Sequence, residues 1–80
     1  MPATATDVET TVTDALETFG ADRAEIKREA TMEQLDIDSL DLAELSQIVE
    51  EKYGVALKGS DSERIKTVGD AIDLIVERAG

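Results

Sequence analysis

The sequence predicts an all-α fold, a small bundle of three main helices and one short helix, with a long loop between the first two main helices. Apolar residues recur at spacings of three and four in three separate stretches, as on one face of a helix. Residues that cap helix N-termini precede these stretches. The 80 residues predict a single domain, residues 1–80, that buries about 60% of its unfolded surface. With one Phe, one Tyr and no Trp, the core must be aliphatic.

The first predicted helix covers Asp7–Phe19. Residues 1–5 precede it and are expected to form a disordered tail. Thr6 and Glu9 fit a capping box, in which the Glu9 side chain reaches back to the Thr6 amide. Gly20 is a suitable helix stop. The predicted buried stripe of this helix consists of Val8, Val12, Ala15, Leu16 and Phe19.

Residues 21–37 form a connection that is longer than an ordinary loop between helices. Ile26 is expected to anchor it to the core. Thr31 and Gln34 fit a second capping box and predict a single helical turn that buries Met32 and Leu35.

The second main helix is predicted over Ser39–Tyr53, with Asp38 as its N-cap and Gly54 as its C-cap. Because Asp38 holds the cap position, the Ser39 hydroxyl is left free at the first helical position. The predicted buried face carries Leu42, Leu45, Val49 and Tyr53, and the opposite face carries Leu40, Glu44, Gln47 and Glu51.

Two further helices are predicted after this one. Ser60 and Glu63 fit a capping box for a short helix that runs through Ile65. Thr67 then caps a last helix over Val68–Arg78. The predicted buried stripe of the last helix is Val68, Ala71, Ile72, Ile75 and Val76.

The composition argues against several classes of function. With 19 acidic and 8 basic residues, the net charge of −11 disfavours nucleic acid and anionic membranes and favours partner proteins that present Lys and Arg. The absence of Cys excludes disulfides and zinc fingers, and the absence of His removes the commonest general base. Residues 1–6 lack a signal-peptide pattern, and no apolar run approaches transmembrane length. We therefore expect a cytoplasmic monomer.

A calcium-binding loop is the metal site that the acids most resemble, because Asp36 and Asp38 begin like an EF-hand. The pattern then fails: Leu40 stands at the fifth position, Asp41 at the sixth where Gly belongs, and Gln47 at the twelfth where Glu belongs. No specific metal site is predicted.

The stretch Asp38-Ser39-Leu40, with Leu35 before it and Asp41 and Glu44 after it, resembles the modification site of the acyl carrier protein family. The resemblance extends from Val8 to Val76 and includes residues 66–72 near the end of the chain. In that family the serine carries a covalent 4'-phosphopantetheine arm derived from coenzyme A. The resemblance therefore implies that Ser39 is the attachment site and that a separate phosphopantetheinyl transferase modifies it.

The resemblance also implies a docking surface and an acyl groove. Docking to basic patches on acyltransferases, ketosynthases or other biosynthetic enzymes is expected of Asp38, Leu40, Asp41, Glu44, Gln47 and Glu51. The residues expected to line the groove are Leu42, Leu45, Ser46, Val49, Leu57, Ile65 and Ala71.

Three positions depart from the family pattern. Gln47 stands where many relatives have an apolar side chain, and Lys58 stands where a proline is common. Ser46 stands where fatty-acid carriers tend to have an apolar residue, and its hydroxyl is expected to avoid an unpaired state by bonding back to the Leu42 carbonyl. These departures favour a polyketide or other specialised pathway over housekeeping fatty-acid synthesis.

Two alternatives to an acyl carrier remain. One is an aminoacyl or peptidyl carrier of nonribosomal type, which shares the fold and the serine, although Asp before the serine is more typical of acyl carriers. The other is an acidic interaction module that is never modified. An enzyme is not expected, since the chain has no pair of nucleophile and base.

Overall fold

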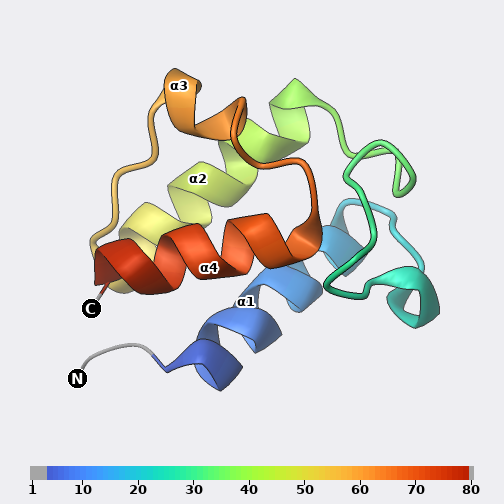
Figure 1. The fold of residues 1–80 in the computed structure, drawn as a ribbon, viewed down its shortest axis with the longest axis horizontal. Coiled ribbons are helices and arrows are strands. Elements are labelled where there is room, and N and C mark those ends of the chain that lie inside the picture. Colours follow the sequence, from blue (N-terminus) through green and yellow to red (C-terminus); the bar gives the residue numbers. More distant parts are fainter. Residues whose placement is uncertain (1–3, 80) are drawn as a thin grey trace.

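The computed structural model describes residues 4–79, except for the side chain of Ser62, and confirms the predicted all-α class. Its main helices are α1 (Ala5–Thr18), α2 (Ser39–Tyr53) and α4 (Val68–Ala79), with the short helix α3 (Gly59–Ser62) between the last two. Residues 19–38 form the crossover between α1 and α2, which contains the 3₁₀ helix η1 (Arg23–Glu25). In Figure 1, α1 runs opposite to α2 and α4, and the crossover lies at the end of the bundle where α1 stops and α4 starts.

Helix α1 begins two residues earlier than predicted. The Thr4 hydroxyl, not that of Thr6, accepts the capping hydrogen bond, from the Asp7 amide at 3.1 Å. The predicted box with Glu9 is therefore wrong: Thr4 and Asp7 have the same spacing as Thr6 and Glu9, and Ala5 favours extension of the helix to the earlier cap. Thr4 and Ala5 are thus not part of a tail, and residues 1–3 lie outside the described residues. Gly20, with φ +111°, follows the helix as predicted.

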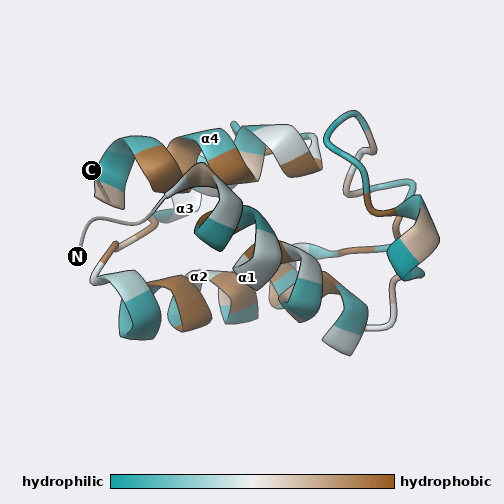
Figure 2. Cartoon of the chain, turned by 90° about the horizontal axis from the view of Figure 1, so that it is seen from below, coloured by the Kyte–Doolittle hydropathy of each residue, from teal (hydrophilic) through white to brown (hydrophobic). Residues whose placement is uncertain are grey.

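The core is aliphatic, as predicted. Helix α4 packs mainly against α1, and Figure 2 shows apolar and polar residues alternating along the helices, as expected for elements with one buried face. Burying one Leu, Ile or Val side chain contributes roughly 1.5–3 kcal/mol. Of the predicted residues, Phe19, Leu42, Tyr53 and Val76 are only half-buried. The largest fully buried side chains are Leu16, Leu45, Ile72, Ile75, Val8, Val12, Val49 and Val68.

A single capped turn organises the second half of the crossover. As predicted, the Thr31 hydroxyl accepts from the Gln34 amide at 3.0 Å, and the Gln34 side chain accepts from the Thr31 amide at 2.9 Å. The turn ends in Asp36, whose φ of +58° lets the Ile37 amide donate back to the Met32 carbonyl at 2.9 Å. Met32 and Leu35 are buried as predicted, and Ile26 packs half-buried against the core.

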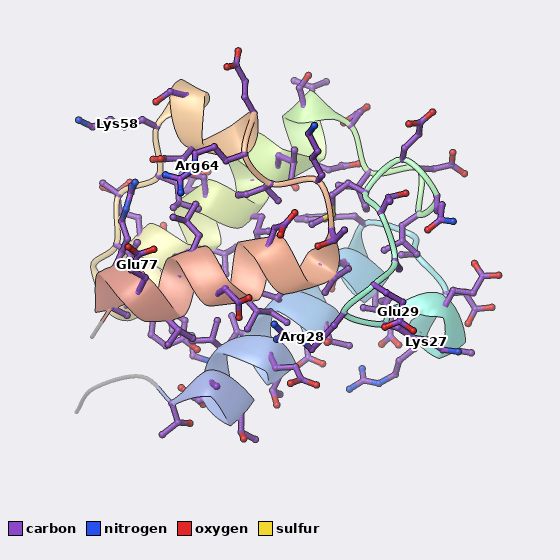
Figure 3. The ribbon with its side chains drawn as sticks, in the orientation of Figure 1. Lys27, Arg28, Glu29, Lys58, Arg64 and Glu77 are labelled. Carbon is purple, nitrogen blue, oxygen red and sulfur yellow. The ribbon has the colours of Figure 1, made fainter. Side chains whose placement is uncertain are left out.

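Backbone hydrogen bonds join the crossover to the start of α4. The Met32 amide donates to the Lys66 carbonyl at 2.9 Å, the Val68 amide to the Ala30 carbonyl at 3.0 Å, and the Gly69 amide to the Arg28 carbonyl at 2.9 Å. Figure 3 shows Arg28 beside α4, where its guanidinium binds both carboxylate oxygens of Asp73 at 2.8 and 2.9 Å. The crossover is therefore held in place up to the turn that leads into α2.

Helix α3 is shorter than predicted and starts earlier. It covers Gly59–Ser62 instead of running through Ile65, and the Lys58 amide, at its N-cap, donates to the Asp61 carboxylate at 2.9 Å. The predicted box of Ser60 and Glu63 does not start this helix, because Asp61 is turned inward to meet α4. Arg78 donates to both oxygens of Asp61, each at 2.7 Å, and together with the Lys58 amide it lowers the pKa of Asp61 from 3.8 to about 2.

The last helix starts as predicted. The Thr67 hydroxyl accepts from the Asp70 amide at 3.1 Å, while the Asp70 carboxylate accepts from the Thr67 amide at 3.1 Å. These bonds to backbone N–H groups lower the pKa of Asp70. Gly69 and Leu74 are buried in addition to the predicted stripe, and Gly69 is covered by Arg28 of the crossover.

Across residues 4–79, no helix is both long enough and apolar enough to cross a membrane.

Candidate functional site

Ser39 lies at the first position of α2, and its local geometry matches the prediction. Asp38 is the N-cap: its carboxylate accepts from the Asp41 amide at 3.0 Å, and the Asp41 carboxylate accepts from the Asp38 amide at 3.4 Å. The two acids thus cap the helix reciprocally. Ser39 is exposed, and its hydroxyl forms no hydrogen bond with another described residue. The hydroxyl is therefore available for modification.

The surroundings of Ser39 fit an anionic phosphodiester only in part. The backbone N–H groups of Ser39 and Leu40 have no acceptor among the described residues, as expected at a helix N-terminus, and they and the helix dipole favour a negative charge there. Asp38 and Asp41 oppose that charge. Because the hydroxyl is exposed, solvent screens this repulsion.

A cavity of about 320 Å³ opens beside Ser39, between the first half of α2 and the segment around α3. Its walls include five of the residues predicted for the groove: Leu42, Leu45, Ser46, Leu57 and Ile65. Ser39 lies on the same helix face as Ser46, so an arm on its hydroxyl would start at the edge of this cavity.

Two residues predicted for the groove lie elsewhere. Val49 and Ala71 have 0% exposure and belong to the hydrophobic core, and neither lines the cavity. Sequence reasoning missed Ala43, Lys58 and Gly59, which also line the cavity. The spacing of Ala43, four residues after Ser39, was a signal that could have located it.

Lys58 borders the cavity through the connection that leads into α3. Figure 3 shows its side chain extending away from the helices, so its ammonium group points to solvent.

The sequence predicted that the Ser46 hydroxyl bonds back to the Leu42 carbonyl of its own helix, and this prediction is wrong. The hydroxyl instead donates to the Leu57 carbonyl at 3.3 Å. The extended residues after Gly54 run back beside α2 and bring this carbonyl within reach, so a partner distant in sequence replaces the Leu42 carbonyl. The groove therefore contains a polar pair whose two members come from different segments of the chain, so the periodicity of one helix does not predict it.

The predicted docking residues form an exposed stripe on α2. Leu40 is 75% exposed and is the large hydrophobic side chain most open to solvent among the described residues. Asp38, Glu44, Gln47 and Glu51 are also exposed, whereas Asp41 is half-buried in the helix cap. Within residues 4–79, no ion pair involves an acid of α2. We call Asp38, Leu40, Asp41, Glu44, Gln47 and Glu51 the α2 stripe.

The same described residues contain no group of three or more acids that could hold a metal ion.

Comparison with known proteins identifies the family. A family model described as a phosphopantetheine attachment site matches residues 7–75, and the chain belongs to this family. Within that family, the chain belongs with the acyl carrier proteins, as three curated relatives of that name indicate. It is 39% identical over 66 residues to the protein from Chlamydia caviae, covering 81% of this chain and 86% of the relative. It is 39% identical over 75 residues to that of Chlamydia felis, covering 92% of each chain. For Rubrobacter xylanophilus the identity is 42% over 60 residues, covering 74% of each chain.

Proposed function

We propose that this protein carries acyl intermediates of fatty-acid or polyketide biosynthesis as thioesters on a 4'-phosphopantetheine group attached to Ser39. The observation that carries the assignment of Ser39 is the position of its hydroxyl, which is exposed, without a hydrogen-bond partner among the described residues, and at the edge of the cavity. The matched family region includes this residue, and the relatives are named acyl carrier proteins. When bound, the prosthetic group supplies the thiol that holds the acyl chain.

The chain's own residues position the hydroxyl but do not activate it. Asp38 and Asp41 are both engaged in the helix cap, and the sequence contains no His that could take the proton. A phosphopantetheinyl transferase must therefore provide the general base and coenzyme A. The same lack of a nucleophile–base pair supports a carrier that is not itself an enzyme.

We further propose that the α2 stripe is the docking surface for the transferase and for biosynthetic enzymes with basic patches. Its acids have no internal cation partners in the described part of the chain, and exposed Leu40 lies next to Ser39. An enzyme whose Lys and Arg residues meet this stripe would bring its active site to the serine. We propose that the protein does this as a cytoplasmic monomer.

The assignment is tested by incubating the purified protein with coenzyme A and a phosphopantetheinyl transferase of broad specificity. The intact mass should increase by one phosphopantetheine group, and one free thiol should become titratable, since the chain has no Cys. Ser39→Ala should gain neither mass nor thiol, while Ser46→Ala and Ser60→Ala should be modified like the wild type. Modification of Ser39→Ala would move the site to another hydroxyl and overturn the proposal.

The nonribosomal alternative is separated by a second measurement, the mass of the native protein's attached group. An acyl chain supports the proposed function, whereas an aminoacyl or peptidyl group supports the alternative. Complete absence of modification under both conditions would favour an unmodified interaction module.

A further inference from the structure

The cavity beside Ser39 has a polar position in a wall that is otherwise largely apolar. Leu42, Leu45 and Ile65 supply aliphatic surface, while the Ser46 hydroxyl and the Leu57 carbonyl form a hydrogen-bonded pair between the two sides. Ser46 follows Ser39 by seven residues on the same helix. That spacing returns it to nearly the same face, roughly 10 Å farther along the axis. The polar pair therefore lies farther along the groove from the point where an arm on Ser39 would start.

The hydrogen bond within this pair is weak by geometry. Its oxygen–oxygen distance of 3.3 Å is longer than the 2.5–3.0 Å that is usual for a hydroxyl donor. Ser46 is half-buried, so water competes incompletely for its hydroxyl. A serine oxygen can also accept, and a carbonyl oxygen has two lone pairs. The pair is thus poorly satisfied and has capacity for another polar group.

We infer that Ser46 and the Leu57 carbonyl make the groove selective for acyl chains that carry a hydroxyl group. This inference rests on the proposed function. A hydroxyl placed between the two residues donates to the Leu57 carbonyl and accepts from Ser46, so two hydrogen bonds replace one long one. A keto oxygen can only accept from Ser46 and leaves the Leu57 carbonyl without that donor. A saturated chain leaves the long bond unchanged and places methylenes against two polar atoms.

The order of preference therefore follows from donor and acceptor counting: hydroxyacyl above ketoacyl, and ketoacyl above or equal to saturated chains of equal length. Ser46 acts as a specificity-determining residue, because its hydroxyl would touch the carried chain.

The experiment loads the wild-type protein with octanoyl, oxo-octanoyl and hydroxyoctanoyl phosphopantetheine amides, transferred from the corresponding coenzyme A analogues. The hydroxyl is moved along the chain in a series of regioisomers, so that one of them reaches the depth of Ser46. Intact mass confirms complete loading before each thermal melt. We expect at least one hydroxyoctanoyl form to melt roughly 4–8 °C above the octanoyl form, the shift that one net hydrogen bond produces in a domain of this size.

Variants separate the role of the hydroxyl from general stability. Ser46→Val and Ser46→Ala should abolish the preference for the hydroxyl and enlarge the shift given by octanoyl. Ser46→Thr, which keeps the hydroxyl, should retain the preference, and Ser60→Ala, at an exposed serine that does not line the cavity, should behave as the wild type.

Equal or greater stabilisation by octanoyl than by every hydroxylated isomer would overturn the inference. A hydroxyl preference that survives in both Ser46→Val and Ser46→Ala would overturn it as well. Failure of Ser39 to gain mass would instead overturn the proposed function, and the mass spectrum registers that result independently of the melting curves.

Discussion

Replacement of Gly69 by Ala tests whether the join between the crossover and α4 determines stability. Gly69 is buried at the start of α4, and its amide donates to the Arg28 carbonyl at 2.9 Å. A Cβ atom at this position would lie 3.1 Å from that same carbonyl oxygen and 3.4 Å from the Arg28 Cβ. The oxygen belongs to backbone that is held by the neighbouring bond from Val68 to Ala30, at 3.0 Å. The crossover must therefore shift to accept the methyl group.

Two opposing effects determine how much Gly69→Ala changes the free energy of unfolding. Ala is favoured over Gly in a helix by up to about 1 kcal/mol, whereas overpacking a close-packed site typically costs about 1–3 kcal/mol. We expect overpacking to outweigh helix propensity, because the closest contact, at 3.1 Å, is with a backbone oxygen and not with the end of a flexible side chain. The net loss should be about 1 kcal/mol, or roughly 4–8 °C in melting temperature. Urea unfolding and thermal melts followed by circular dichroism measure both quantities.

Gly59→Ala is the matched control, since a Cβ atom at Gly59 would meet no atom within 4 Å. It should leave stability unchanged or raise it by up to about 1 kcal/mol, through helix propensity and a less flexible unfolded chain. If Gly69→Ala were as stable as the wild type or more so, the crossover backbone would shift without a cost in stability, and the reasoning would be refuted.

Two other predictions concern charge. Because the hydrogen bonds from Arg78 and from the Lys58 amide hold the Asp61 pKa at about 2, below 3.8, its contribution is fully present above about pH 4 and is lost as the pH falls towards 2. The gap in urea unfolding free energy between wild type and Asp61→Asn should narrow over that range; a constant gap would contradict this. Glu44→Lys on the α2 stripe should slow transferase loading more than Glu9→Lys on α1, although both change the net charge equally, and the difference should shrink with added salt. Equal slowing by the two would remove the support for the stripe.

Features that depend on residues close together in the chain could be predicted from the sequence. The cap at Asp38, the C-cap at Gly54 and the cap at Thr67 each involve groups within four residues of one another. Helical periodicity likewise separated the buried face of α2 from the face that carries Leu40. Together these local rules placed Ser39 at the first position of a helix, with its hydroxyl not used as the cap.

The starts of α1 and α3 were predicted wrongly. The reason is local for α1 and tertiary for α3. Thr4 and Thr6 both head acceptable capping patterns, so the sequence alone did not choose between them. Asp61 lies between Ser60 and Glu63 of the predicted capping box, but in the structure its carboxylate is buried against Arg78, which follows it by seventeen residues. An ion pair of that separation has no periodic signature.

Which residues line the cavity depends on how the segments pack against one another. Val49 shares the apolar face of α2 with Leu45, yet only Leu45 lines the cavity. Thr11 was not predicted to be buried, although it lies between Val8 and Ala15 on the apolar face of α1; it is 7% exposed, and its hydroxyl lies 2.7 Å from that of Tyr53. The sequence by itself determined the helices, their caps and the exposed serine, since these depend on bonds within one or two turns. Tertiary structure alone decided which side chains meet across the groove and gave Ser46 its partner, because the Leu57 carbonyl reaches it only when the residues after α2 fold back along the helix.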